Sequence, residues 1–349
     1  MAEWARAEGA RPRHGRRDEI PADEVGRVVG PVVPDRAPDL FERVSWLLRM
    51  PLDTPTIPVE DERTGCTLWL KLEYLLPSGC TKDRMAIYIV TRAIAAGHVG
   101  PSTVVVEASS GSTSIALAMV CATLGVRFRA YMPKTVSGER VLMIRRLGGE
   151  VVLTPAESGM SGAVGALADD AAANPDVYAV RQFENLDNAD AHAMSTGPQL
   201  IRQVGVPLDG FVAGVGTGGT LMGVARALRA AGQDTILAQA LPVATFTPDG
   251  RPEVVGGVPG VVEGMSRLLD PDAVGLAEPV RVPEAEALSA AREFAARGLA
   301  VGPSSGLNIA AARRLGERLG AGHHVATILP DRMERYFSTA LFDDVAAEL

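Results

Sequence analysis

A lysine and three short runs of glycine and hydroxyl residues are the parts of this sequence best suited to chemistry. The lysine, Lys82, stands in "SGCTKDR" (78–84), after a Gly-Cys-Thr turn and before an apolar run that predicts a helix. The helix dipole disfavours a cation at such a position. Lys82 is therefore either a plain surface charge or the group that the turn presents, and the other runs bear on that choice.

The run "ASSGSTS" (108–114) follows an apolar β-branched stretch and precedes a second predicted helix. Hydroxyl groups and free backbone N–H groups at a helix start form a receptor for a carboxylate. A serine N-cap is the simpler interpretation, but a cap uses one serine, whereas residues 109–114 hold four serines and a threonine. The composition of this run favours anion binding.

The run "GTGGT" (216–220) also lies between an apolar stretch and a predicted helix. Glycines let the backbone approach an anion and turn several N–H groups toward it, and threonines add hydroxyl groups. The run has neither the GxGxxG nor the GxxxxGK[ST] spacing. It predicts a site for a single phosphate group and speaks against a nicotinamide-dependent dehydrogenase.

Two further strand-to-helix junctions are "PSSG" (303–306) and "PDRMERY" (330–336), and each could be turn and cap chemistry alone. Taken together, the junctions and Lys82 indicate one binding site. An amine for a Schiff base, a phosphate cradle, a carboxylate receptor and a hydroxyl for a ring nitrogen are what pyridoxal 5′-phosphate acting on an amino acid requires. This combination favours Lys82 as the group that its turn presents.

The elements that must position these groups alternate between short β-branched runs and longer amphipathic runs, which predicts mostly parallel sheets covered by helices on both faces. In such folds ligands bind at the carboxyl ends of the strands, where the runs described above lie. Two blocks, before and after about residue 190, predict two three-layer α/β domains. The predicted strands are 103–107, 128–132, 150–153, 177–180, 211–215, 236–241, 299–301 and 324–329, and the predicted helices are 113–124, 138–147, 162–173, 221–231, 284–297 and 307–319.

From about residue 51 to residue 336 the sequence resembles fold type II pyridoxal-phosphate enzymes of the cysteine synthase / cystathionine β-synthase family, whose fold is tryptophan synthase β-like. The motifs that carry the resemblance occur in the order usual for that family: "KLEYLLPSGCTKDR", "EASSGSTSIALA", "QFEN", "GVGTGGTLMG" and "VGPSSG". Several motifs in one order are far more specific than any one of them.

The resemblance implies a role for individual residues. Lys82 would be the catalytic lysine that forms the Schiff base, and Ser304 would meet the pyridine nitrogen. The cofactor phosphate would be held by Gly216, Thr217, Gly218, Gly219 and Thr220. The substrate carboxylate would be held by Ser109, Ser110, Thr113 and Gln182.

The resemblance also implies an organisation. Residues 41–84 and 191–349 would form a larger cofactor-binding domain, and 85–190 a smaller mobile domain that holds the substrate carboxylate. Composition, not the resemblance, predicts that residues 1–40 are a poorly ordered N-terminal extension, because the first 17 residues carry five arginines and almost no apolar periodicity; a basic arm that binds a partner is the alternative. The implied assembly is a homodimer.

The implied reaction is β-replacement on a serine-derived amino acid through an α-aminoacrylate intermediate, with a small nucleophile as second substrate. A neutral serine at the ring nitrogen makes the ring a weaker electron sink, which favours prompt loss of a β-leaving group. The first alternative is β-elimination to pyruvate and ammonia, as in a cysteine desulfhydrase or a serine dehydratase. The alternative of another class is a catalytically degenerate binding protein on this fold.

Four positions depart from the family pattern. Ser112 stands where an asparagine usually reaches the 3′-oxygen of the cofactor, a variant that resembles the cysteine desulfhydrase branch, so Ser112 is a predicted cofactor contact. Arg267 is either a surface arginine or a group that selects an anionic second substrate. "PDRMERY" carries Arg332 and Met333, which we expect to alter the wall near the cofactor ring. Cys80 is a small buried hydrophobe or a sulfur relay.

Composition excludes several other classes of protein. The chain has 349 residues, 47% hydrophobic and 22% charged, with a formal net charge of −8. This charge argues against a nucleic-acid surface, and the longest apolar runs are too short to span a bilayer. Three cysteines without a CxxC pair, and no signal peptide, predict a cytoplasmic protein. The five histidines have no metal-ligand spacing, so we expect no metal.

Overall fold

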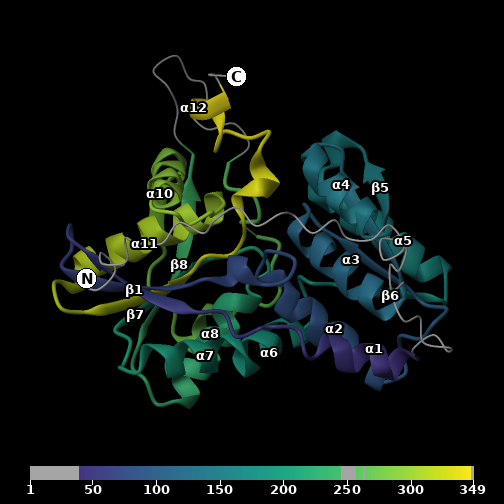
Figure 1. Cartoon of the computed structure of the whole chain (residues 1–349), viewed down its shortest axis with the longest axis horizontal. Helices are drawn as coiled ribbons and strands as arrows, with labels where there is room; N and C mark the ends of the chain where they lie inside the picture. The colour runs from purple at the N-terminus through teal and green to yellow at the C-terminus, as the bar shows by residue number, and fades with distance from the viewer. Residues whose placement is uncertain (1–38, 245–256, 262–263, 347–349) are drawn as a thin grey trace, which may run out of the picture. The chain divides into compact units, whose positions relative to one another are not determined.

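The computed structural model describes residues 39–244, 257–261 and 264–346. The predicted N-terminal extension therefore lies almost wholly outside the described residues, as does most of the long segment before Gly260. In the described part of the chain, the strands form one sheet of six and one sheet of four (Figure 1).

The six-stranded sheet has the order β1-β2-β10-β7-β8-β9. Strand β1 pairs with β2 antiparallel, and all other neighbours are parallel. Its strands are β1 (Thr56–Asp61), β2 (Cys66–Lys71), β7 (Gly210–Gly214), β8 (Ile236–Val243), β9 (Val280–Pro283) and β10 (His324–Ile328).

The four-stranded sheet has the order β5-β4-β3-β6 and is parallel throughout. Its strands are β3 (Val104–Ala108), β4 (Arg127–Pro133), β5 (Glu150–Thr154) and β6 (Val177–Ala179). All strands of this sheet come from one continuous stretch of sequence, whereas the six-stranded sheet takes strands from both sides of it. The predicted domain boundaries at residues 85 and 190 stay a prediction.

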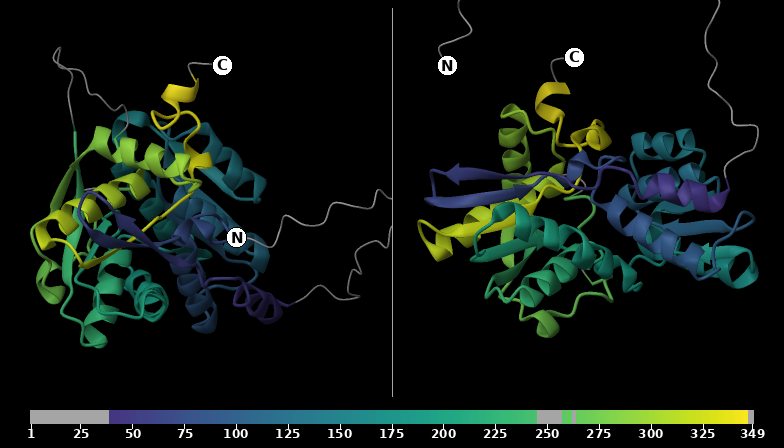
Figure 2. Two further views of the ribbon diagram at one scale, coloured as in Figure 1. Left: turned by 60° about the vertical axis from the view of Figure 1, so that its left-hand side comes forward. Right: turned by 60° about the horizontal axis from the view of Figure 1, so that its bottom comes forward.

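Helices cover both faces of each sheet (Figures 1 and 2). The helices are α1 (Leu40–Leu47), α2 (Lys82–Ala95), α3 (Ser112–Leu124), α4 (Gly138–Arg146), α5 (Gly159–Ala173), α6 (Asp187–Met194), α7 (Thr196–Val204), α8 (Gly219–Ala230), α9 (Pro271–Val274), α10 (Glu284–Ala296), α11 (Pro303–Leu319) and α12 (Asp343–Ala346). Short 3-10 helices lie at η1 (Glu73–Leu75), η2 (Ala156–Ser158) and η3 (Met333–Tyr336). Among the described residues, no helix is long and apolar enough to cross a membrane.

The alternation of side chains along each strand explains the layers. In β7, Val212 packs into the core under α10 and α11, whereas its neighbours Phe211 and Ala213 pack into the core under α7 and α8. In β3, Val105 joins the core that contains α2 and α3, whereas Val104 and Val106 face α5. Since successive side chains point to opposite faces, a continuous β-branched run buries both faces of a strand.

Some elements differ from the predictions, and α6, α7 and β9 were not predicted. Residues 299–301 are not a strand, because Val301 makes only an isolated bridge with Arg332. The antiparallel hairpin β1–β2 was missed, since Pro58 and the charged ends of β1 hide its alternation. Helix α11 begins at Pro303, one turn earlier than predicted, because proline is well tolerated at the first helical position.

Candidate active site

Helix α2 begins at the predicted catalytic lysine, and the turn before it is held by the next residue. The buried Asp83 carboxylate accepts hydrogen bonds from the backbone N–H of Ser78, at 2.7 Å, and from the Ser78 hydroxyl. Burial raises the pKa of Asp83 to about 6, although both Ser78 bonds oppose this. Lys82 is partly buried, lines a cavity, and has no hydrogen-bond or ion-pair partner for its amine among the described residues. The turn thus leaves an uncommitted amine facing a cavity.

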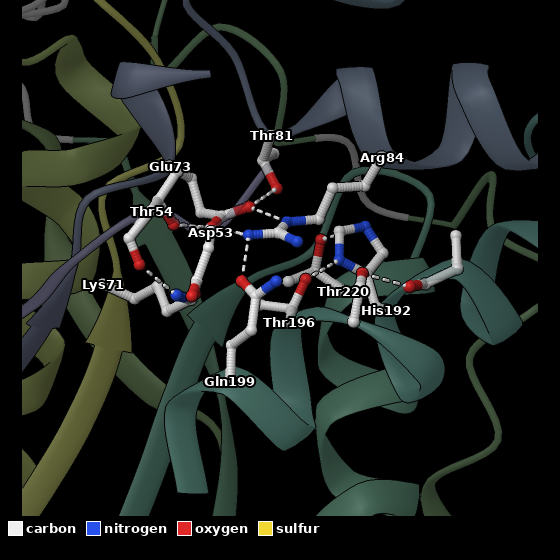
Figure 3. A network of polar contacts seen from close by, with 12 residues as sticks. Asp53, Thr54, Lys71, Glu73, Thr81, Arg84, His192, Thr196, Gln199 and Thr220 are labelled. Atoms are coloured by element: carbon white, nitrogen blue, oxygen red, sulfur yellow. Dashed lines mark hydrogen bonds and ion pairs between the residues drawn. The ribbon is translucent and has the colours of Figure 1, made fainter. Parts of the chain in front are cut away.

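A buried ion pair lies beneath this turn (Figure 3). The Glu73 carboxylate accepts from Arg84 Nε at 2.5 Å, from Arg84 Nη2 at 2.6 Å and from the Thr81 hydroxyl at 3.2 Å. Burial alone would raise the pKa of Glu73, but Arg84 outweighs it and holds that pKa below its usual range. Because Thr81 precedes Lys82 directly, the pair fixes the position from which the lysine leaves the backbone.

The "GTGGT" run forms the turn from β7 into α8 and has the features of an anion cradle. Gly218 has φ +84°, and a Cβ on Gly216 would lie 2.3 Å from the carbonyl oxygen of Gly260, so both positions require glycine. The first N–H groups of α8 have no intrahelical partner, as at any helix start. The loop therefore presents backbone donors to the same cavity that Lys82 lines.

Helix α6 supports this cradle with two side chains one turn apart. Asn188 donates to the Thr217 hydroxyl at 2.9 Å, and His192 Nε2 lies 3.2 Å from the Thr220 hydroxyl. His192 Nδ1 lies 2.8 Å from the Thr196 hydroxyl, and burial lowers the pKa of His192 to about 3, so the ring is neutral. In the tautomer protonated at Nε2, His192 donates to Thr220 and leaves the Thr220 hydroxyl free to donate to an anion.

The predicted carboxylate loop joins β3 to α3. Two of its side chains are engaged within the protein: the Ser109 hydroxyl lies 2.6 Å from Ser114 Oγ and accepts from two backbone N–H groups, and the Thr113 hydroxyl donates to Gln182 Oε1 at 2.6 Å. The backbone N–H groups of Ser110, Ser112 and Thr113 have no partner among the described residues. The loop is an anion receptor built largely on backbone donors, and Ser109 acts as a cap.

Gln182 is held from behind by a buried glutamate that the sequence did not single out. Glu107 accepts from the backbone N–H of Gln182 at 3.0 Å and from that of Ala108 at 2.7 Å. Burial raises the pKa of Glu107 to about 8. Gln182 Nε2 donates to the Ala108 carbonyl at 2.8 Å, which leaves its second N–H for a ligand.

Ser304 lies in the first turn of α11, is buried, and has no hydrogen-bond partner among the described residues. Across the cavity, the Ser112 hydroxyl donates to Asp331 Oδ2 at 3.1 Å, and the Tyr336 hydroxyl donates to the same oxygen at 2.7 Å. Ser112 is therefore tied to Asp331 in the structure, a partner that the sequence did not reveal.

One cavity is lined by every predicted site residue except Gly219, which packs on Asn188 instead. A free amine, a glycine cradle with unpaired N–H groups, and an unpartnered serine hydroxyl face this cavity together. The donor set fits pyridoxal 5′-phosphate: Lys82 for the aldehyde, residues 216–220 for the phosphate and Ser304 for the ring nitrogen.

The remaining departures from the family pattern lie in different places. Cys80 lines the cavity, but burial raises the pKa of its thiol. Arg267 is 79% exposed and pairs with Glu184 at 2.8 Å, away from the cavity of Lys82, as expected for a surface arginine. Arg332 and Met333 do not line that cavity, contrary to expectation, because Met333 packs against the cluster of Leu288 and Tyr336.

Sequence reasoning missed five residues that contact or line the site: Glu107, Arg140, Asn188, His192 and Asp331. One signal was present, because Asn188 and His192 are spaced i, i+4 on one helix face and meet Gly219 and Gly223, also spaced i, i+4. Glu107 and Asp331 lie within the motifs "EASSGSTSIALA" and "PDRMERY", whereas no local signal marks Arg140.

The chain matches known proteins along most of its length. Residues 48–331 match the model of the family described as "Pyridoxal-phosphate dependent enzyme". Cysteine synthase B of Campylobacter jejuni is 36% identical over 308 residues, which covers 87% of this chain and 99% of that protein.

Two solved structures are similar as well. A hydrogen sulfide-producing enzyme from Fusobacterium nucleatum has a TM-score of 0.75 and 31% identity, covering 86% of this chain and 92% of its own. An O-acetylserine-dependent cystathionine β-synthase from Helicobacter pylori has a TM-score of 0.74 and 30% identity, covering 88% and 99%.

Proposed function

The chain belongs to the pyridoxal-phosphate-dependent enzymes of the cysteine synthase family, which act by β-replacement or β-elimination on serine derivatives, and from this premise we propose that it catalyses β-replacement. The first substrate is a serine-derived amino acid, and the second is a small nucleophile. The observation that carries the proposal is the uncommitted Lys82 amine, which shares one cavity with an anion cradle and a carboxylate receptor.

Each group has a role that follows from its position. Residues 216–220 bind the cofactor phosphate, and Ser304 donates to or accepts from the ring nitrogen without carrying a charge. The loop 109–113 and the free N–H of Gln182 orient the substrate by its carboxylate. When bound, pyridoxal phosphate supplies the electron sink that makes the Cα proton acidic.

Lys82 Nζ takes up that proton. The amine lies at the start of α2, lines the cavity and has no competing partner among the described residues, so it is placed to act as the base at Cα. The buried pair of Glu73 and Arg84 keeps the lysine from swinging away, since it anchors Thr81.

β-Elimination is the second candidate, and one observation favours it. Ser112 stands where the family usually carries an asparagine, a variant that resembles the cysteine desulfhydrase branch, and its hydroxyl donates to Asp331 at 3.1 Å. A similar structure is that of a hydrogen sulfide-producing enzyme of Fusobacterium nucleatum, and hydrogen sulfide is the group that leaves Cβ when cysteine is the substrate.

Product analysis separates the two reactions. The purified enzyme, loaded with pyridoxal phosphate, is given O-acetyl-L-serine, O-phospho-L-serine, L-serine or L-cysteine, each with and without sulfide. We expect cysteine to form from a serine ester only when sulfide is present. If pyruvate and ammonia form without sulfide as fast as the amino acid is consumed with sulfide, the reaction is β-elimination and the proposal of β-replacement fails.

A lysine variant tests whether the site is catalytic at all. Lys82→Ala is expected to lower turnover by roughly 10³-fold or more, because the Schiff base and the Cα base are both lost. Lys134→Ala removes an exposed lysine and is the matched control. Borohydride should fix the cofactor to Lys82 in the wild type, and labelling at Lys134 instead would contradict the assignment.

We also propose that the enzyme is a cytoplasmic homodimer. The three cysteines are buried and unpaired, which suits a reducing compartment. Most of the family's enzymes assemble as dimers, and sedimentation of the purified chain checks this.

A further inference from the structure

Among the cavity residues without a role in the proposed reaction are Arg140, Asp331 and Tyr336. All are buried, with 5%, 4% and 1% of their surface exposed. They come from α4 and from the segment after β10, so they join the two sheets at the cavity. Two of them contact the carboxylate loop with a charged group, Arg140 through the Ser110 carbonyl and Asp331 through the Ser112 hydroxyl, and Arg140 is the cation of the two.

The Arg140 side chain is packed directly on that loop. Its Nη1 donates to the Ser110 carbonyl at 2.9 Å, and its guanidinium carbon lies 5.0 Å from the centre of the Tyr336 ring. A Cβ on Gly111, where φ is +143°, would lie 2.3 Å from Arg140 Cδ. A side chain at position 111 would collide with Arg140, so the loop requires glycine where the arginine packs against it.

Arg140 has no ion pair in the part of the chain that the structure describes. No carboxylate of the described residues lies within ion-pairing distance of Arg140, and its Nε is buried without a hydrogen-bond partner. Two other buried arginines are paired, Arg84 with Glu73 at 2.5 Å and Arg313 with Asp61 at 3.0 Å, whereas Arg335 donates to the Ser78 carbonyl and, like Arg140, has no carboxylate partner among the described residues. A buried charge without an ion pair is unfavourable, and the aromatic face of Tyr336 offsets part of this, so Arg140 would favour an anion bound at this loop.

The carboxylate loop offers only neutral donors of its own. They are the backbone N–H groups of Ser110, Ser112 and Thr113, the Ser110 hydroxyl and one N–H of Gln182. Lys82, the other cation of the cavity, is committed to the cofactor and to Cα in the proposed function. The guanidinium of Arg140 is thus the one positive charge available to this loop among the described residues.

We propose that Arg140 is the positioning residue that makes this loop selective for a charged α-carboxylate. Its guanidinium orients the loop through the Ser110 carbonyl and supplies the positive potential that the neutral donors lack. The inference rests on the proposed function and concerns the same site. It predicts that the enzyme discriminates an amino acid from its carboxamide chiefly through Arg140.

The test measures this discrimination directly. The apparent Kd and kcat/KM are determined for O-acetyl-L-serine and for O-acetyl-L-serinamide, or for L-cysteine and L-cysteinamide if the product assay selects elimination. The variants are R140Q, R140M, which keeps the aliphatic packing, and R140K, which keeps the charge. R145Q removes the same charge from an exposed position of the same helix and is the matched control.

We expect R140Q and R140M to reduce the carboxylate-to-carboxamide ratio on the order of tenfold, mainly through KM, with pyridoxal phosphate affinity unchanged. R140K keeps the charge but loses the Nη1 bond to Ser110, so it should recover only part of the ratio, and R145Q should keep all of it. A purely structural role would lower both kcat/KM values equally and leave the ratio intact, which overturns the inference.

Two outcomes remain. If neither neutral variant folds, R140K alone decides, because moving the charge from Ser110 should raise KM for the carboxylate and not for the carboxamide; equal changes overturn the inference. If the wild type consumes none of the amino acids, the proposed function fails rather than the role of Arg140.

Discussion

Two residues next to the reactive amine show how burial sets chemical character at the residue scale. Cys80 lies two positions before Lys82 and lines the same cavity, yet its thiol is 2% exposed. Burial raises its pKa, and Arg335 only partly opposes this. Since the thiolate is the reactive form of cysteine, Cys80 packs beside the site as a small hydrophobe and is a poor sulfur relay.

Replacing Cys80 tests this point. C80S is expected to keep turnover within about threefold, because a neutral thiol contributes packing and no nucleophile. C121S, a serine at a second buried cysteine in the core of α2 and α3, controls for the cost of burying a hydroxyl. Loss of cysteine formation in C80S alone, with substrate binding retained, would establish a sulfur relay.

At the scale of elements, α2 is positioned less by its own sequence than by the buried pair beneath its first turn. Arg84 belongs to α2 and Glu73 to the 3-10 helix η1, and both side chains are at most 1% exposed. Breaking such a pair leaves an uncompensated charge in the interior. The pair also holds Thr81, so its loss should disturb both folding and the direction of Lys82.

We expect E73Q to lower the free energy of unfolding by about 3 kcal/mol or more, measured by urea denaturation, with a matching loss of turnover. The double variant E73Q/R84M removes the stranded cation and should recover part of the stability. E317Q, in the exposed pair with Arg63, should cost less than about 1 kcal/mol. Equal effects of E73Q and E317Q would contradict the importance of burial.

At the scale of the whole molecule, the buried titratable groups tie stability to pH. Glu107 has a pKa of about 8 in the folded chain, raised by burial from 4.5. Between these values the unfolded chain releases a proton that the folded chain keeps. The contribution of Glu107 is therefore fully present below about pH 4.5 and is lost as pH rises through about 8.

The variant E107Q should remove this part of the pH dependence. From pH 5 to pH 8 the wild type should lose stability relative to E107Q, with a slope approaching about 1.4 kcal/mol per pH unit, measured by urea unfolding at each pH. E157Q, at an exposed position, is the control and should follow the wild type. Parallel curves for wild type and E107Q would show that Glu107 is ionised throughout.

Local sequence patterns were enough to predict most of the helices and strands of the two sheets. Strands such as β3 and β4 and helices such as α3 were predicted within one or two residues, because β-branched runs and amphipathic periods are properties of neighbouring residues. The strand at 299–301 failed for the opposite reason. Leu299 to Val301 has strand-like residues, but in the structure Val301 pairs only with Arg332, beyond the end of β10, in an isolated bridge.

The sequence by itself determined the chemistry of the loops, since glycine and hydroxyl residues before a helix expose N–H groups wherever they occur. Only the tertiary structure decided what surrounds them. Arg140 meets Ser110 and Tyr336, and Asp331 meets Ser112 across 219 positions of the chain. Such partners have no local spacing, because they depend on how two sheets pack. The fold thus turns a row of separate anion sites into one cavity around Lys82.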